Sequence, residues 1–565
     1  MTASDYIATF LHEQGVTVVY EMIGGMITRL VDSLSQSGKF KIVSMHHEQA
    51  AGFAAEGWAR MQSKPGVALA TSGPGATNLV TAIGSCFFDY TPAVIITGQV
   101  NTHEMVKRKG VRQQGFQETD IVSIVRPITK AAWQVRNVQE LPQILTEAFR
   151  TAMTPPKGPV LIDIPMDVQA MELAEPLPPA TISLSTASEY EALHAWIKRF
   201  LADLRLASRP IILAGGGIRS ADATEDLRKL VAATHIPVVH SLMGLDVLPY
   251  ANPYRIGLIG TYGNRWANKA LMQSDLVLVL GARLDIRQTG SQVEAFQQGR
   301  PFYQLDIEPS QINNRLSGCH GCVADLRDAL GELARAMQTT AQPEYGSWME
   351  QINTARQQWP DTAEVCCPHG IHPNNFIHNL SRIFGKAGAF VADVGKNQMW
   401  TAQSLELQTN QRALFSGGMG AMGFALPTAI GACFASQQET VVISGDGGIQ
   451  CNIQELETIR HHNLPIKIVI INNQSLGMVQ QFQEDYCGGR LQSTRWGYSA
   501  PDFCKVAKGY AIPGKKLTKP QDETALLKWF HDSNGPTLLE VTVDPFLKLF
   551  PKTTYGKVLD QMDPQ

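Results

Sequence analysis

The chain alternates short apolar runs with longer amphipathic segments along most of its length. Runs such as VTVVYEM at residues 16–22, PIILA at 210–214 and TVVIS at 440–444 are followed closely by glycine or by a polar turn. Apolar runs of this length, separated by helical patterns, predict strands of parallel sheets that are covered on both faces. The sequence therefore predicts an α/β protein with open parallel sheets.

The predicted elements fall into three blocks, which we interpret as three α/β domains. The first block covers residues 1–175, the second 190–340 and the third 365–550. A proline-rich stretch at 175–180 (EPLPPA) predicts a linker after the first block. No short repeat is visible, but the first and third blocks are candidates for distant copies of one plan.

Composition narrows the classes of function. The chain has 565 residues, 44% hydrophobic and 18% charged, with a net charge of −3. This balance lacks the basic surface of a nucleic-acid-binding protein. No apolar stretch reaches the length of a membrane span, and the N-terminus lacks the apolar core of a signal peptide. Nine cysteines in no disulfide-like pattern, with CHGC at 319–322 as a lone pair, favour a reducing cytoplasm.

Two polar turns in the third block point to chemistry. Asp446 follows the run TVVISG directly, and Asn473 follows the run IKIVIIN, with a helix expected over 452–462 between them. Ligands of α/β sheets bind beyond the carboxyl ends of the strands, where these two side chains can meet. Carboxylate and amide oxygens suit Mg²⁺, and GDGG leads into a helix N-terminus that favours phosphate. We therefore predict a magnesium–diphosphate anchor, although each turn alone is also typical of ordinary loops.

The spacing of GDG and NN resembles the signature of the thiamine diphosphate (ThDP) enzymes. The resemblance implies that Asp446, Asn473 and the Ser475 carbonyl hold Mg²⁺, with Gly447 and Gly448 at the diphosphate. The context SMHHEQAAGFAAEGWAR also matches this superfamily, and it implies that Glu48 is the acid that shares a proton with the cofactor's pyrimidine ring. An ordinary capping or surface glutamate is the alternative.

Two further segments match the diphosphate-side domain of the superfamily. GGMGAMGFALP implies that Met422 supports the bent cofactor and that the Gly420 carbonyl accepts from its amino group. ADVGKNQMW implies that Gly395, Lys396 and Asn397 lie near the phosphates, although close relatives carry Gln and His at the last two positions. The superfamily builds each site from two subunits, so the resemblance implies at least a homodimer.

Over nearly its whole length the chain resembles the acetolactate synthase large-subunit family. The segments TSGPGATNLVTAIGSCFFDYTPAVIITGQV, GFQETDIVSIVRPITK and NNQSLGMVQQFQEDY carry the resemblance. It implies that pyruvate is decarboxylated and that the two-carbon unit joins an acceptor carbonyl, with a second pyruvate giving 2-acetolactate. The implied substrate-side residues are Gly25, Phe116, Gln117, Lys130, Arg287, Met478 and Phe482. Arg287 would meet the acceptor carboxylate; a surface cation is its alternative reading.

Glycine-rich loops in the middle block follow the FAD-binding pattern of this family. The loops are LAGGGIRS, SLMGLD, GLIGTYGN and GARLDIR, and loops of this kind after strands admit a dinucleotide pyrophosphate. FAD has no redox role in the family's reaction. The implied FAD residues are Gly215, Gly216, Gly217, Leu242, Met243, Gly260, Gly263, Arg283, Asp306 and Asp325.

Three departures from the family pattern bear on the acceptor. Phe482 replaces a tryptophan, EMIGG replaces Tyr-Pro-Gly-Gly, and the tail FLKLFPKTTYGKVLD differs from the usual closing segment. They fit a carboligase that accepts a ketone or keto-sugar, similar to the flavin-containing carboligase of yersiniose-type pathways. The alternatives are a pyruvate oxidase or simple 2-keto-acid decarboxylase, and a non-catalytic binding protein. The need for a regulatory subunit stays open.

Overall fold

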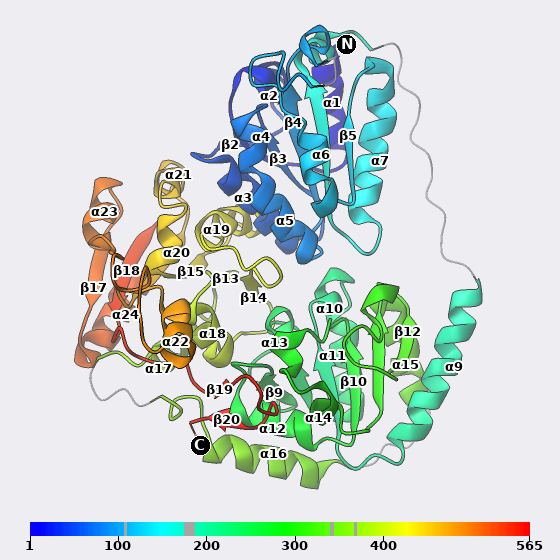
Figure 1. Ribbon diagram of the computed structural model, residues 1–565, viewed down its shortest axis with the longest axis vertical. Coiled ribbons are helices and arrows are strands. Elements are labelled where there is room, and N and C mark those ends of the chain that lie inside the picture. Colours follow the sequence, from blue (N-terminus) through cyan, green and yellow to red (C-terminus); the bar gives the residue numbers. More distant parts are fainter. Residues whose placement is uncertain (107–109, 174–186, 339–343, 366–369, 565) are drawn as a thin grey trace.

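Three domains, each built on a six-stranded parallel sheet, make up the molecule (Figure 1). The computed structural model describes residues 1–106, 110–173, 187–338, 344–365 and 370–564; the predicted linker at 175–180 lies outside these residues. The three parallel sheets confirm the predicted fold class. Each sheet lies within one of the three predicted blocks, whose exact bounds remain a prediction.

The N-terminal domain has the strand order β2-β1-β3-β4-β6-β5. Apolar side chains cover both faces of the sheet, as the continuous apolar runs predicted. Its strands are β1 Val18–Met22, β2 Lys41–Ser44, β3 Gly66–Ala70, β4 Ala93–Gln99, β5 Ala131–Gln134 and β6 Pro159–Pro165. Its helices are α1 Ala3–Glu13, α2 Thr28–Ser37, α3 Glu48–Gln62, α4 Pro74–Asn78, α5 Val80–Phe88, α6 Ile121–Val125, α7 Leu141–Met153 and α8 Met166–Ala170.

The central domain has a different order, β12-β11-β10-β7-β8-β9. This is the doubly wound order of dinucleotide-binding sheets, in which the crevice opens between the first and fourth strands, here β7 and β10. The strands are β7 Pro210–Ala214, β8 Val238–His240, β9 Arg255–Leu258, β10 Leu276–Leu280, β11 Phe302–Asp306 and β12 His320–Val323. The helices are α9 Ala187–Leu204, α10 Gly217–Ser220, α11 Thr224–Thr234, α12 Arg265–Gln273, α13 Ile286–Thr289, α14 Val293–Gln297, α15 Leu326–Gln338 and α16 Gly346–Gln358.

The C-terminal domain has the order β14-β13-β15-β16-β18-β17. Its strands are β13 Ala389–Ala392, β14 Arg412–Phe415, β15 Thr440–Gly445, β16 Ile466–Asn472, β17 Gly514–Leu517 and β18 Thr537–Thr542. Its helices are α17 Pro373–Ile383, α18 Lys396–Ser404, α19 Ala425–Ser436, α20 Asp446–Gln450, α21 Glu455–His461, α22 Gly477–Tyr486, α23 Phe503–Gly509 and α24 Glu523–Asp532. The helix expected over 452–462 is α21, which begins later, because Asn452 is held by Gly423 and by Gln49 of the N-terminal domain.

Helices α3 and α19 join the two outer domains. A Cβ on Gly57 would lie 2.2 Å from the Thr428 carbonyl oxygen, and one on Gly431 would lie 1.9 Å from the Ala54 carbonyl oxygen. The two helices therefore touch backbone to backbone, which only glycine permits at these positions. Counted within their own domains, the outer sheets share one strand order, 2-1-3-4-6-5, so they are copies of one topology.

The chain ends on the central domain. Strands β19 Lys552–Thr553 and β20 Met562–Asp563 form a short antiparallel pair. The Thr553 N–H donates to the Thr261 carbonyl at 2.8 Å, and Arg265 donates to the Met562 carbonyl at 2.9 Å. The red tail in Figure 1 accordingly lies against the green central domain. Within the described residues, no helix combines the length and apolar character needed to cross a membrane.

Candidate active site

Three oxygen atoms converge at the carboxyl edge of the C-terminal sheet. Strands β15 and β16 are neighbours, so Asp446 and Asn473, which follow them, lie side by side. The side-chain oxygen of Asn473 lies 2.9 Å from Asp446 Oδ1 and 2.8 Å from the Ser475 carbonyl oxygen. Three acceptors this close repel one another unless a cation lies between them or the amide is turned to donate.

The two distances from the Asn473 oxygen fit magnesium. Mg²⁺ binds oxygens at about 2.05 Å in an octahedron, which places neighbouring oxygens about 2.9 Å apart. Burial raises the pKa of Asp446 to about 6, and a bound divalent cation would keep its carboxylate ionised. The Tyr498 hydroxyl donates to the other carboxylate oxygen, Asp446 Oδ2, at 2.9 Å, leaving Oδ1 for the cluster.

The loop with Gly420 and Met422 adjoins this cluster. A Cβ on Gly447 would lie 2.5 Å from Leu476 Cδ2 and 3.2 Å from Met422 Cε, so both side chains lie over the Gly-Asp-Gly turn. Gly420 has a φ of +65°, a backbone region that favours glycine, and is exposed. The cluster therefore has an apolar wall that ends in an open glycine turn.

Asp393, directly after β13, holds this loop and was missed by the sequence reasoning. Its carboxylate accepts from the Gly423 N–H at 3.0 Å and the Ala425 N–H at 3.1 Å, and burial raises its pKa to about 6. A Cβ on Gly448 would lie 2.6 Å from Asp393 Oδ1, so this carboxylate also supports the Gly-Asp-Gly turn. A strand-end position beside the switch point of the sheet was its available signal.

The segment 395–397 lies on the other side of the turn. Asn397 Oδ1 would lie 2.5 Å from a Cβ on Gly395 and 3.1 Å from one on Gly445, so the three residues are in contact. Lys396 is buried, which lowers its pKa to about 8, and its Nζ donates to the Leu547 carbonyl at 2.7 Å. Its stem packs beside Gly477. We call Gly395, Lys396, Asn397, Gly420, Met422, Asp446, Gly447, Gly448, Asn473 and Ser475 the C-terminal half-site.

A second group gathers at the equivalent edge of the N-terminal sheet. Glu48 is the first residue of α3; its Oε2 accepts from Asn78 Nδ2 at 2.9 Å, and its Oε1 would lie 3.2 Å from a Cβ on Gly75. Gln117 has a φ of +65° and packs on Gly73 of the same turn. We call Gly25, Glu48, Phe116 and Gln117 the N-terminal half-site.

The remaining N-terminal candidates differ in their surroundings. Phe116 is 79% exposed, and the exposed Gly25 sits in a loop whose Met26 N–H donates to Thr71 Oγ1 at 3.2 Å. Lys130 instead donates through Nζ to carbonyls at the end of α7, among them Thr151, and burial lowers its pKa to about 8. The structure thus joins Gly25 and Gln117 to the Glu48 turn, whereas Lys130 forms no hydrogen bond or ion pair with that turn among the described residues.

Arg287, Met478 and Phe482 lie on helices at the rim of the C-terminal half-site. Arg287 is exposed on α13, and its guanidinium contacts Met399 Sδ at 3.8 Å. Phe482 on α22 is 56% exposed and its ring lies 4.8 Å from that of Tyr486, whereas Met478 is partly buried on the same helix. Arg287 and Phe482 thus present a cation and an apolar ring without a partner that would neutralise or cover them among the described residues.

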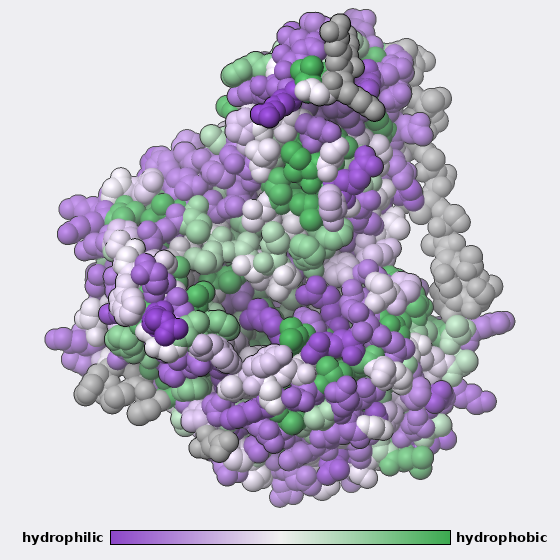
Figure 2. All heavy atoms as spheres, viewed as in Figure 1, coloured by the Kyte–Doolittle hydropathy of each residue, from purple (hydrophilic) through white to green (hydrophobic). Residues whose placement is uncertain are grey.

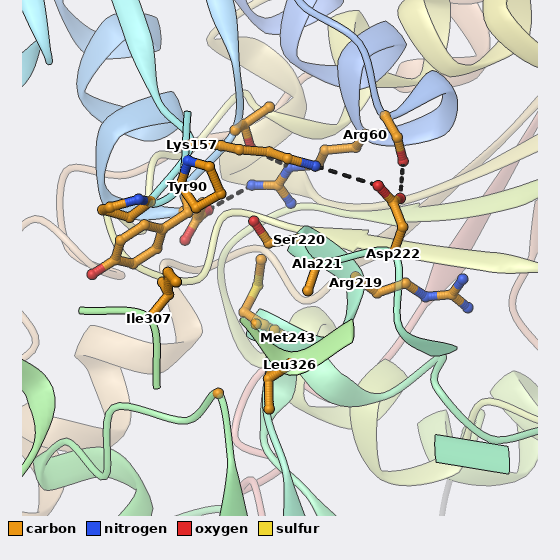
Figure 3. Close-up of a pocket in the computed structure, with 18 of the residues that line it drawn as sticks. Arg60, Tyr90, Lys157, Arg219, Ser220, Ala221, Asp222, Met243, Ile307 and Leu326 are labelled. Atoms are coloured by element: carbon orange, nitrogen blue, oxygen red, sulfur yellow. Dashed lines mark hydrogen bonds and ion pairs between the residues drawn. The ribbon is translucent and has the colours of Figure 1, made fainter. Parts of the chain in front are cut away.

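A cavity of about 460 Å³ opens where the three domains meet, beside the β7–β10 crevice (Figure 3). Six of the predicted FAD residues line it: Gly216, Gly217, Met243, Arg283, Asp306 and Asp325. Four do not: Gly215 packs on the Gly281 carbonyl, Gly260 on the Arg287 carbonyl, Gly263 within its own turn, and Leu242 on the C-terminal core. A cavity of this size beside a doubly wound sheet fits part of a dinucleotide.

The sequence reasoning missed the walls that the other domains supply to this cavity. Arg60, Tyr90 and Lys157 reach it from the N-terminal domain, and the Asp222 carboxylate pairs with Lys157 at 3.4 Å (Figure 3). The Tyr90 hydroxyl donates to Glu308 of the central domain. These residues carry no motif, and their place follows only from how the domains pack.

Comparison with known proteins shows which family has this architecture. Three family models match in order: Thiamine pyrophosphate enzyme, N-terminal TPP binding domain, at residues 1–124; its central domain, at 197–333; and its C-terminal TPP binding domain, at 393–541. The fold and the two half-sites thus define a ThDP enzyme.

Individual relatives narrow the class. The chain is 35% identical to the acetolactate synthase isozyme 1 large subunit of Escherichia coli K12 over 563 residues, covering 99% of this chain and 97% of that protein. It is 34% identical to a probable acetolactate synthase large subunit of Methanococcus aeolicus, covering 96% and 92%. It is also 35% identical to the acetolactate synthase large subunit of Corynebacterium glutamicum, covering 98% of this chain and 89% of that protein. The chain belongs to the acetolactate synthase large-subunit family, whose members are C–C bond-forming transferases.

Proposed function

We propose that the protein decarboxylates pyruvate and joins the two-carbon unit to an acceptor carbonyl, giving 2-acetolactate when the acceptor is a second pyruvate. The observation that carries this proposal is the oxygen cluster of Asp446, Asn473 and Ser475 beside Met422. The relatives, which are named as acetolactate synthases, support the same reaction. When bound, ThDP supplies the electron sink that makes decarboxylation feasible.

The chain's own residues bind the cofactor and move one proton. Asp446, Asn473 and the Ser475 carbonyl would hold Mg²⁺, and the N–H groups that begin α20 would be available to a diphosphate. Met422, which lies over the Gly-Asp-Gly turn, would support the cofactor from the apolar side. Glu48, fixed by the Asn78 amide, would share a proton with the ring nitrogen N1′ of the pyrimidine and so set the basicity of its amino group.

Each active site is proposed to combine half-sites from two subunits. Within the described residues of one chain, no hydrogen bond or ion pair joins Glu48 to Asp446, Asn473 or Ser475. Apolar surface is left exposed on the N-terminal domain over α5 and α6, where Phe88 is 38% and Ile124 45% exposed (Figure 2). A homodimer would cover such surface and bring the two kinds of half-site together.

FAD is the proposed occupant of the three-domain cavity. The β7–β10 crevice supports a pyrophosphate at Gly216 and Gly217, and a Cβ on Gly217 would lie 2.7 Å from Gly281 Cα. The acidic pair Asp306 and Asp325 suits ribose hydroxyls. A flavin held in this way has a structural role in the proposed reaction.

The acceptor pocket is proposed to take ketones or keto-sugars as well as keto acids. Phe482 stands where the family pattern carries tryptophan, and its exposed ring offers less area and no N–H donor. Arg287, at the rim, suits a carboxylate when the acceptor is an acid. The name large subunit, which the relatives carry, supports a second, smaller regulatory subunit as a partner of this chain.

Product analysis by NMR tests the function. Purified protein is incubated with pyruvate, ThDP, Mg²⁺ and FAD, with and without a cyclic ketone. We expect 2-acetolactate from pyruvate alone and a tertiary alcohol when the ketone is present. Acetate with peroxide would identify an oxidase, acetaldehyde alone a decarboxylase, and no ThDP-dependent turnover a binding protein; each of these results would overturn the proposal.

A further inference from the structure

The loop at residues 416–423 runs from the wall of the cavity to the C-terminal half-site. It leaves β14, carries Gly420 and Met422, and enters α19. Its far end is held within its own domain by Asp393. Its near end is held from another domain, because the Gly417 N–H donates to Asp89 Oδ2 at 3.0 Å and the Gly418 N–H donates to Asp89 Oδ1 at 2.7 Å.

Asp89 is a buried carboxylate at a helix C-terminus, so its negative charge must be balanced by nearby donors. It caps the C-terminus of α5, where the helix dipole disfavours negative charge, and its side chain is 2% exposed. Arg60 compensates through an ion pair of 2.7 Å with Asp89 Oδ2. The same guanidinium donates to the Phe415 carbonyl at 2.6 Å, so Arg60 and Asp89 together grip the end of β14 and the start of the loop.

The wall of the cavity touches the same two glycines. A Cβ on Gly417 would lie 2.5 Å from Met243 Sδ, and one on Gly418 would lie 2.6 Å from Phe88 Cβ. Arg60, Asp89 and Met243 all line the cavity, and Figure 3 shows Arg60 and Met243 approaching it from different domains. The loop backbone is therefore packed directly against the walls that an occupant would contact.

We propose that Asp89 is a positioning residue that couples the occupant of the three-domain cavity to the loop that carries Gly420 and Met422. The inference rests on the proposed function for the identity of the two ligands, FAD and ThDP. An occupant that fixes Arg60, Asp89 and Met243 fixes Gly417 and Gly418, and through them the support of the thiamine ring. A flavin that has no redox role in the reaction would thus have a structural one, which is to fix the position of this loop.

The coupling is measurable as a ratio of affinities. FAD binding is titrated by the quenching of its fluorescence, with and without saturating ThDP and Mg²⁺. We expect ThDP to tighten FAD binding at least about fivefold in the wild type, and FAD to tighten ThDP binding by the same factor, because coupling free energies are reciprocal. In Asp89→Asn we expect each ligand to change the affinity for the other by less than about twofold. The reason is that a neutral amide offers one hydrogen-bond acceptor where the carboxylate offers two.

Asp325→Asn is the matched control, because it also neutralises an aspartate of the cavity wall but lies on the central domain away from the loop. Its FAD affinity falls while its coupling factor stays that of the wild type. If circular dichroism shows that Asp89→Asn does not fold, Met243→Ala is used in its place. This variant removes the thioether that packs against Gly417, and we expect it to lose the coupling in the same way.

Two results would overturn the inference. A wild-type factor of one, with both ligands bound, would refute the coupling and leave the proposed function intact. A factor that survives in Asp89→Asn or in the folded Met243→Ala substitute would show that another path carries it. If the wild type binds no FAD or no ThDP, the proposed function fails and the coupling fails with it.

Discussion

At the scale of single residues, Glu48 and Asp446 depend on neighbours that orient them. Glu48 is buried at the start of α3 and fixed by the Asn78 amide, while the Tyr498 hydroxyl fixes one oxygen of Asp446. The motifs made Glu48 and Asp446 predictable from sequence. Tyr498 was not predictable, because it stands 52 positions from Asp446 in an irregular segment, and only the packing of residues 487–500 brings it there.

Replacement of the acid tests its role directly. Glu48→Gln keeps the shape of the side chain but removes the acidic proton that we propose Glu48 shares with N1′. We expect Mg²⁺ and ThDP to bind with affinities close to wild type, while H/D exchange at C2 of the bound cofactor, followed by NMR after acid quench, slows by about 10²-fold or more. Exchange at the wild-type rate would show that another group does this work.

Tyr498 gives a second test, on the metal rather than the acid. Loss of a hydrogen bond to a metal ligand typically weakens metal binding by about 10–100-fold. We expect this loss for Mg²⁺ in Tyr498→Phe, measured by titrating Mg²⁺ against ThDP binding at fixed ThDP. Tyr510→Phe, a tyrosine after α23, is the control that keeps wild-type affinity. Equal Mg²⁺ affinity in Tyr498→Phe would remove Tyr498 from the site.

At the scale of elements, the sequence predicted strands and strand-end turns well and missed contacts between distant elements. The apolar runs at 440–445 and 466–472 are β15 and β16, and their neighbouring positions follow from the parallel pattern. The attachment of Asp89 to Gly417 and Gly418 was not predictable, because more than 300 residues separate them and neither side carries a motif. Local periodicity determines elements, whereas domain packing determines these contacts.

Helix α22 presents the residue that we expect to select the acceptor. Phe482→Trp restores the larger ring of the family pattern. We expect the product ratio, with 2-ketobutyrate and pyruvate competing as acceptors, to shift toward 2-ketobutyrate by about tenfold, a size typical of small changes in a hydrophobic pocket. Tyr486→Phe, the neighbouring ring on the same helix, should leave the ratio unchanged. An unchanged ratio in Phe482→Trp would contradict its role.

Helix α17 provides a test of stability against pH. His378 is buried between Asp361 Oδ2 at 2.9 Å and Glu406 Oε1 at 2.8 Å; burial alone lowers the pKa of His378, but these two carboxylates raise it above its usual value. The imidazolium therefore contributes stability that is fully present below the unfolded-state pKa of about 6.5 and is lost as pH rises through the folded-state pKa.

The corresponding variant is His378→Asn, compared with wild type by urea unfolding. We expect it to be less stable by about 1–3 kcal/mol at pH 5.5, the size of hydrogen bonds to charged groups, with a smaller deficit at pH 9. His531→Asn, which removes an exposed histidine beside Asp532, should show no such trend. A deficit for His378→Asn that grows with pH would contradict the assigned direction of its pKa.

At the scale of the whole molecule, the division of the candidate site residues between the two outer domains is the feature behind the proposed assembly. If each site takes Glu48 from one subunit and Asp446 from its partner, two inactive variants can rescue each other. Mixed dimers of Glu48→Gln and Asp446→Asn contain one site with both residues intact. Random reassociation of an equal mixture should therefore recover roughly a quarter of wild-type activity. No recovery, in a mixture shown to exchange subunits, would place each site within one chain.

Because the two outer domains share one strand order, their equivalent turns can be compared residue by residue. The turn after β3 reads Ser-Gly-Pro-Gly and α4 begins at Pro74, whereas the turn after β15 reads Ser-Gly-Asp-Gly and α20 begins at Asp446. Proline offers no ligand oxygen and no N–H, so the N-terminal copy has no metal ligand at this position. Its next glycine, Gly75, instead lies close to Glu48, where a side chain would crowd the carboxylate. The same position in two equivalent turns thus differs in chemistry: the C-terminal turn offers a carboxylate that suits a cation, and the N-terminal turn leaves room for the carboxylate of Glu48.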